Sequence, residues 1–197
     1  SLPMLEHMGF KVLDEHPYRI TPAGGPPIWM HDFGIAGAAA LRGAEVATLH
    51  AVFEDAFARI FRGEVENDDF NRLVVAAQLP AHEIVVLRAY AKYMRQIGFA
   101  LSQAFIEATL AAHPAIAQAL VELFVARFDP ARADGREARV SERVGAIEGA
   151  LEAVENLSED RVLRQYLVLV LATTRTNYWR RDAQGAVVVD GSDIARH

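Results

Sequence analysis

A histidine and an aspartate stand next to each other in the stretch IWMHDFGIAG, residues 28–37. Imidazole and carboxylate groups are common metal ligands, so His31 and Asp32 raise the question of a metal site. Residues 28–35 read as a β-strand, however, and successive side chains of a strand point to opposite faces. The pair therefore diverges unless the strand is bulged. The other histidines show no partner spacing, so we expect no metal site and interpret His31 as a structural residue.

A second group of residues that could bind a ligand is a stripe of three basic residues on a predicted helix that begins at Pro80. These residues are Arg88, Lys92 and Arg95. Apolar residues cover more than half of that helix, which predicts burial on several sides. The stripe is then either a solvated or ion-paired face, meeting the acidic stretch GEVENDD at 63–69, or a docking contact for another domain or an anionic ligand. The sequence does not separate these readings, and we keep the three residues as a candidate interdomain contact.

Neither common nucleotide-binding signature occurs in the chain. There is no G-x-G-x-x-G, and Gly37 and Gly43 are one residue too far apart for a phosphate loop, with Ala44 and Glu45 in place of the expected Lys-Ser/Thr pair. We therefore expect no catalytic, cofactor-binding or metal-binding residue in this sequence.

The composition narrows the class of protein further. The 197 residues are 52% hydrophobic and 23% charged, which is typical of a globular protein. A net charge of -6 argues against a nucleic-acid partner, and the longest apolar run is far shorter than the ~18 residues of a membrane span. The absence of cysteine suits a reducing compartment, so we expect a cytoplasmic protein without a membrane partner.

Helix-ending and turn-forming residues, together with the spacing of the apolar residues, predict a mainly α protein in four parts. Residues 1–35 read as a helix followed by two strands, a small α/β piece that looks cut at its start. Residues 36–43 form a small-residue linker, and residues 44–176 form a multi-helix bundle. Residues 177–197 read as a short C-terminal β hairpin.

Capping residues predict where several of these helices begin. Asn67 or Asp68, Ser102 and Ser158 are expected at N-cap positions, and Pro114 is expected in a first turn.

Three long stretches of the chain resemble one known family. They are LPMLEHMGFKVLDEHPYRI, FEDAFARIFRGEVENDDFNRLVVAAQLPAHEIVVLRAYAKYMRQIGFALSQAFIEATLAAHPAIAQALVELFVARFDP and NLSEDRVLRQYLVLVLATTRTNYW. In this order they are similar to the middle region of the very large bacterial NAD-specific glutamate dehydrogenases. The resemblance covers most of the chain.

The resemblance implies an arrangement of regulatory ACT-like modules, then a helical segment, then a catalytic domain. Residues 1–35 would be the truncated end of an ACT-like module, and the last hairpin would lead toward the catalytic domain. The parent enzyme would use NAD and form a homo-oligomer, and this segment would contact other domains of the same chain. Neither Lys11 nor Lys92 matches the family's glycine-rich catalytic lysine motif, so the segment alone is expected to be inactive.

Two alternatives stay open at this point. A free-standing helical module that binds a ligand or a partner would show the same periodicity. A metal-dependent phosphohydrolase of the His-Asp type is a further alternative, and it would require a bound divalent ion.

Overall fold

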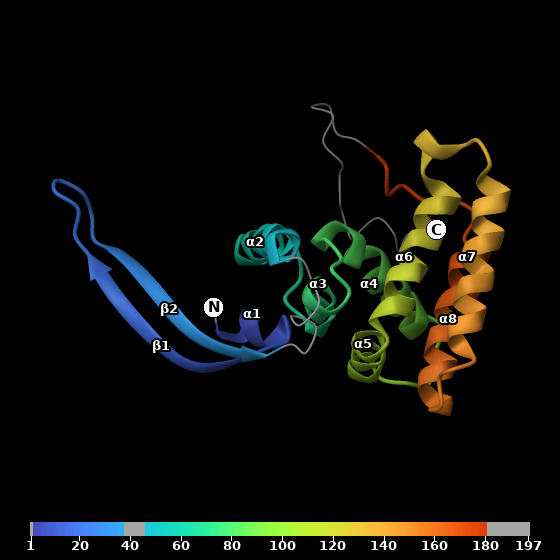
Figure 1. Cartoon of the computed structure of the whole chain (residues 1–197), viewed down its shortest axis with the longest axis horizontal. Coiled ribbons are helices and arrows are strands. Elements are labelled where there is room, and N and C mark those ends of the chain that lie inside the picture. The colour runs from blue at the N-terminus through green and yellow to red at the C-terminus, as the bar shows by residue number, and fades with distance from the viewer. Residues whose placement is uncertain (1, 38–45, 181–197) are drawn as a thin grey trace.

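The computed structural model describes residues 2–37 and 46–180. Within these ranges the chain is mostly helical, with a two-stranded antiparallel sheet near its N-terminus (Figure 1). The predicted mainly α class and the small N-terminal α/β piece are therefore confirmed. Of the predicted C-terminal hairpin, residues 177–180 form a turn, and the rest lies outside the described residues. The boundaries proposed for the four parts stay predictions.

The N-terminal piece is a short helix followed by a long hairpin. Helix α1 (Leu2–His7) is followed by a turn at Gly9, whose φ of 90° favours glycine, and the chain then enters β1 (Phe10–Ile20) and β2 (Ile28–Gly37). The register pairs Phe10 with Gly37 and Ile20 with Ile28, so the two strands are paired from one end to the other. Figure 1 shows the hairpin extending away from the helices, with only its base near α1 and α2.

One irregularity interrupts this ladder. Val12 pairs with Ile35 and Asp14 pairs with Gly34, so Leu13 is an extra residue of β1 without a place in the register. The Asp14 carboxylate accepts a hydrogen bond from the Gly34 backbone N–H at 3.1 Å, which holds the two strands together beside the extra residue.

The helical part follows as a series of short and medium helices joined by tight connections. Their bounds are α2 (Val46–Phe61), the 3-10 turn η2 (Asp69–Asn71), α3 (Arg72–Ala76), α4 (Ala81–Gln96), α5 (Gln103–Ala112), α6 (Pro114–Phe128), the 3-10 turn η3 (Pro130–Arg132), α7 (Arg136–Leu151) and α8 (Leu157–Ala172). Helices α6, α7 and α8 lie side by side at the end far from the hairpin (Figure 1).

Helix α4 lies at the centre of the core, as its wide apolar arc predicts. Ile84, Leu87 and Met94 are fully buried on it. The arc is narrower than predicted near its C-terminal end, because Tyr93 and Ile97 are 46% and 52% exposed.

Several predicted helix boundaries can be compared with the structure. Ser102 caps α5 by accepting a hydrogen bond from the Phe105 N–H, and Pro114 lies in the first turn of α6, as predicted. The prediction for α8 is wrong, because Asn156 and not Ser158 is the N-cap. The Asn156 side chain accepts from the backbone N–H groups of Ser158 and Glu159, so Ser158 is already inside the helix.

The chain after α8 is held against the helices by two anchors. Arg127 of α6 donates to the Val170 and Thr173 carbonyl oxygens at 2.6 and 3.2 Å, which satisfies acceptors at the end of α8. The Tyr178 hydroxyl donates to the His82 carbonyl oxygen at 3.2 Å.

No single helix in residues 2–37 or 46–180 could cross a bilayer, and the pair that reaches that length together, α5 and α6, is bent by 99°.

Candidate functional site

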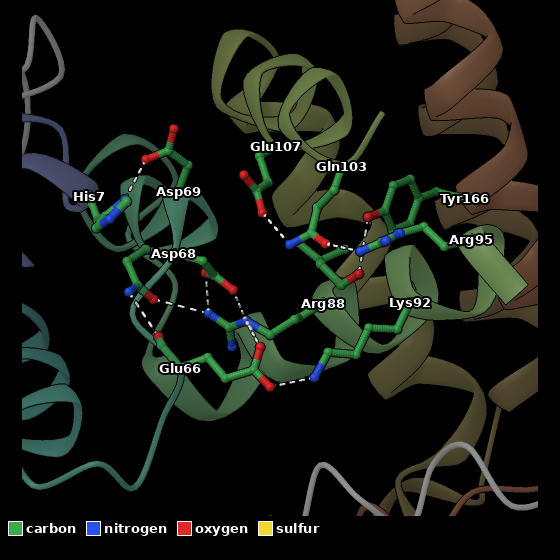
Figure 2. Close-up of polar contacts among 12 residues, drawn as sticks. His7, Glu66, Asp68, Asp69, Arg88, Lys92, Arg95, Gln103, Glu107 and Tyr166 are labelled. Atoms are coloured by element: carbon green, nitrogen blue, oxygen red, sulfur yellow. Dashed lines mark hydrogen bonds and ion pairs between the residues drawn. The ribbon is translucent and has the colours of Figure 1, made fainter. Parts of the chain in front are cut away.

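The most concentrated group of buried charges centres on Arg88 of α4 (Figure 2). Arg88 is only 4% exposed. Its Nε donates to Asp68 Oδ2 at 2.7 Å, and its Nη2 donates to Asp68 Oδ1 at 2.8 Å and to Asn71 Oδ1 at 3.1 Å. The guanidinium carbon lies 5.5 Å from the centre of the Phe70 ring. The contact between Arg88 and Asp68 is bidentate and charge-assisted, and this is the geometry in which a carboxylate binds an arginine most strongly.

Local structure explains why Asp68 is available to Arg88. Asp68 occupies the N-cap position of η2 in an extended conformation, but its side chain makes no capping hydrogen bond. Its carboxylate, which sequence analysis assigned to a cap, neutralises the buried guanidinium instead. Asn71 is held in place by its own amide, which donates to the Glu66 carbonyl oxygen at 3.0 Å.

The structure separates the three residues of the predicted basic stripe. Lys92 is bound by the Glu66 carboxylate, and Arg95 donates from Nη1 to Gln103 Oε1 at 2.9 Å. Lys92 is about half-exposed, whereas Arg88 is buried. The predicted pairing with the acidic stretch 63–69 is therefore confirmed for Arg88 and Lys92. The alternative of a solvated face is wrong for Arg88, because η2 covers it.

A buried carboxylate extends the network onto α5. Gln103 donates from Nε2 to Glu107 Oε1 at 2.8 Å, and Glu107 is 6% exposed. Burial raises the pKa of Glu107, and the nearby carboxylates of Asp68 and Asp69 act in the same direction. The hydrogen bond from Gln103 and the charge of Arg88 oppose that rise.

Two contacts beside the Arg88–Asp68 pair involve the first and the last described helices. At one end, His7 Nδ1 of α1 lies 2.7 Å from Asp69 Oδ1, and Arg72 approaches the same carboxylate at 3.1 Å. At the other end, the fully buried Tyr166 hydroxyl of α8 donates to the Leu87 carbonyl oxygen at 3.0 Å. Burial raises the pKa of Tyr166 well above its ordinary value, so this hydroxyl keeps its proton. Figure 2 shows these groups distributed from α1 across η2 and α4 to α5 and α8.

The chemistry of this network favours positioning over catalysis. Arg88, Lys92 and Arg95 each already have an acidic or amide partner from outside α4. The cavity beside Arg88 and Lys92 has a volume of ≈ 90 Å³, well below the ~300–1,000 Å³ typical of small-molecule sites. A buried charge pair such as Arg88–Asp68 fixes the relative placement of its two elements, because removing one partner leaves the other unpaired in the interior.

Three buried polar residues of this region were not predicted from the sequence: Asn71, Glu107 and Tyr166. Each is a polar residue beside apolar ones, and that is the only signal the sequence carries for a buried hydrogen-bonding group. Arg88 and Leu87, the partners of Asn71 and Tyr166, are far from them in sequence, so those pairings require the fold, whereas Gln103 is one helical turn from Glu107.

The structure also shows how His31 and Asp32 are oriented. β2 continues without irregularity through both residues, so their side chains point to opposite faces. His31 Nδ1 lies 2.6 Å from Glu15 Oε1, across the hairpin. Among residues 2–37 and 46–180, no three His, Cys, Asp or Glu side chains are grouped as metal ligands would be.

The described residues thus form a set of packed helices that follows an N-terminal hairpin. Comparison with known families matches three successive parts of the chain. Residues 1–49 match the ACT3 domain of glutamate dehydrogenase, residues 65–130 match helical motif 3 of the same enzyme, and residues 146–190 match the catalytic domain of bacterial NAD-glutamate dehydrogenase. The chain belongs to the bacterial NAD-specific glutamate dehydrogenase family.

Curated relatives agree with this assignment. The chain is 43% identical over 187 residues to the NAD-specific glutamate dehydrogenase of Pseudomonas aeruginosa, covering 93% of this chain and 12% of that protein. It is 41% identical over 184 residues to the enzyme of Halomonas elongata, and 42% identical over 186 residues to that of Mycobacterium tuberculosis. These matches cover 93% and 90% of this chain and 11% of each relative. The chain therefore spans about one ninth to one eighth of the relatives' length.

Proposed function

We propose that these residues form a non-catalytic connector in a large NAD-dependent glutamate dehydrogenase. The parent enzyme would deaminate L-glutamate oxidatively to 2-oxoglutarate and ammonia with NAD as acceptor. The connector would hold ACT-like modules at a set position against the catalytic domain, in a homo-oligomeric protein of the cytoplasm.

One observation carries this proposal. Two hydrogen bonds join the flanking parts of the chain to the elements that form the Arg88–Asp68 pair. His7, from the part that matches an ACT domain, contacts Asp69, which follows Asp68 in the chain. Tyr166, from the part that matches a catalytic domain, donates to the carbonyl oxygen of Leu87, which precedes Arg88. Arg88 itself belongs to the part that matches helical motif 3. Rigid elements and paired charges that link two regions supply a physical path for energetic coupling between them.

A first experiment tests the non-catalytic part of the proposal. NADH is titrated into the 197-residue chain while its fluorescence is followed, with a full-length family enzyme as the positive control. We expect no saturable binding, because the sequence has no dinucleotide fingerprint. Saturable micromolar binding would contradict the proposal.

A second experiment tests the connecting role in the full-length enzyme. Arg88→Met should change kcat or KM for glutamate by about threefold or more if positioning of the catalytic domain depends on the buried pair. Arg62→Met is the matched control, since Arg62 is exposed and pairs with Glu64 of the same acidic stretch. Steady-state kinetics identical to wild type for Arg88→Met, in an enzyme that remains folded, would refute the connecting role.

The interdomain contact predicted for Arg88, Lys92 and Arg95 is proposed here for Lys92 and Arg95 alone. Arg88 is covered within this chain, so Lys92 and Arg95 are the stripe residues left to face another domain. Reversal of the charge of Arg95 in the full-length enzyme should alter assembly or effector response. An unchanged oligomeric state and unchanged kinetics would leave Arg95 as a surface residue only.

A further inference from the structure

A second region that could bind a ligand lies outside the Arg88 network, between β2 and α2. His31, Phe33 and Ile35 alternate along β2 and therefore share one face of the sheet. That face and α2 enclose an open groove with a volume of ≈ 470 Å³, within the ~300–1,000 Å³ typical of small-molecule sites.

The wall of the groove formed by α2 is a ladder of aromatic rings. Phe53 and Phe57 have ring centres 6.0 Å apart and planes inclined by 28°, and Phe57 and Phe61 continue the stack at 6.5 Å and 13°. Phe61, at the end of the ladder, is 71% exposed. Leaving a phenylalanine so exposed at the end of an ordered aromatic stack provides a surface on which a further flat ring can pack.

The polar group of this lining is His31, and a neighbour fixes its orientation. Its ring lies 6.2 Å from that of Phe33, with the planes inclined by 15°, and its Nδ1 is 2.6 Å from Glu15 Oε1. An ionised carboxylate only accepts hydrogen bonds, so the contact places the proton of neutral His31 on Nδ1. Nε2 is then an acceptor, and within the described residues it has no hydrogen-bond partner.

We propose that this groove binds a small planar aromatic molecule that carries one hydrogen-bond donor, such as a phenol. The ring would pack against the phenylalanine ladder, and the hydroxyl would donate to Nε2 of His31. The volume and the single acceptor favour a free small molecule of this class. Because the groove shares no residue with the Arg88 network, the proposal is independent of the connecting role.

The test is a titration of the 197-residue chain with 4-methylphenol, followed by backbone amide chemical shifts in ¹H–¹⁵N spectra. Toluene, which has the same ring and methyl group but no hydroxyl, is the donor-free comparison. We expect saturable shifts at residues 31, 33, 57 and 61, with a Kd of about 1 mM and about tenfold weaker binding of toluene. Shifts that rise linearly without saturation, or equal affinity for both compounds, would overturn the proposal.

Three variants locate the site. His31→Phe should remove the preference for 4-methylphenol over toluene, and Phe61→Ala should weaken both compounds by about fivefold or more. His16→Ala is the matched control, because His16 is a hairpin histidine on the opposite face of the sheet, and it should leave both affinities unchanged. A His31→Phe variant that still prefers 4-methylphenol, with its amide spectrum otherwise intact, would also overturn the assignment.

Discussion

Replacing Arg88 by methionine should lower the free energy of unfolding of the 197-residue chain by about 3 kcal/mol. Methionine keeps most of the aliphatic length but removes every donor. The change leaves Asn71, which is 2% exposed, without one of its partners, and leaves Asp68 as an ionised carboxylate with no cation in contact. Removing one member of a buried ion pair costs about 3–5 kcal/mol. The Asp68 side chain is 17% exposed and can regain some hydration, which places the expected loss at the lower end.

The assay is urea unfolding at pH 7, followed by circular dichroism, with thermal unfolding as a second measure. A loss of about 3 kcal/mol corresponds to a decrease in Tm of about 6–12 °C for a chain of this size. Lys92→Met is the control on the same helix. Its partner Glu66 is 54% exposed, so the loss should be at most about 1 kcal/mol.

A double-mutant cycle isolates the pair itself. Asp68→Asn alone leaves the buried guanidinium without its counter-charge, whereas Asp68→Asn combined with Arg88→Met removes both charges. The double variant should therefore be more stable than the sum of the two single losses predicts, by about 1 kcal/mol or more. Additive losses, or an Arg88→Met loss no larger than that of Lys92→Met, would refute the conclusion that the buried pair stabilises this fold.

Three further outcomes follow from the core and the network. Leu87→Ala or Met94→Ala should each lower the free energy of unfolding by about 2–5 kcal/mol, measured by urea unfolding, because both side chains are fully buried. Tyr166→Phe should cost about 1 kcal/mol in the same assay, since one buried hydrogen bond is lost while the ring is kept, and no loss would show that the bond to α4 is unimportant. Burial raises the pKa of Glu107 above its unfolded value, so its stabilising effect is complete below the unfolded pKa and is lost as pH rises through the folded pKa. Glu107→Gln should therefore be at least as stable as wild type at pH 7 and should gain less stability on acidification toward pH 5, measured as Tm against pH; an unchanged pH profile would contradict this.

The features that sequence analysis predicted well are those that depend on near neighbours in the chain. Ile84, Leu87 and Met94 recur at helical spacing, and this periodicity alone predicts a buried face of α4. The two strands of the hairpin are likewise predicted by residue type and by the turn between them. Even the partner of the basic stripe was among the candidates, because the acidic stretch 63–69 precedes α4 closely.

The features that it missed depend on competition between partners, which a sequence does not display. Asp68 had the residue type of a helix cap, but the buried guanidinium of Arg88 binds its carboxylate more strongly than a backbone N–H would. Asn156 and Ser158 are both good capping residues, and the choice between them rests on which of the two has the extended backbone; it is Asn156.

The extra residue in β1 makes the hairpin unequally sensitive to changes in chain length. Val12 and Asp14 pair with the consecutive residues Ile35 and Gly34, so a chain without Leu13 would keep every later pair in the same register. Loss of a residue between Glu15 and Ile20 would instead transfer all the side chains on one side of the gap to the opposite face of the sheet. Related sequences should therefore tolerate a one-residue deletion at Leu13, although it lies within a strand, and should preserve the number of residues that follow it up to the turn.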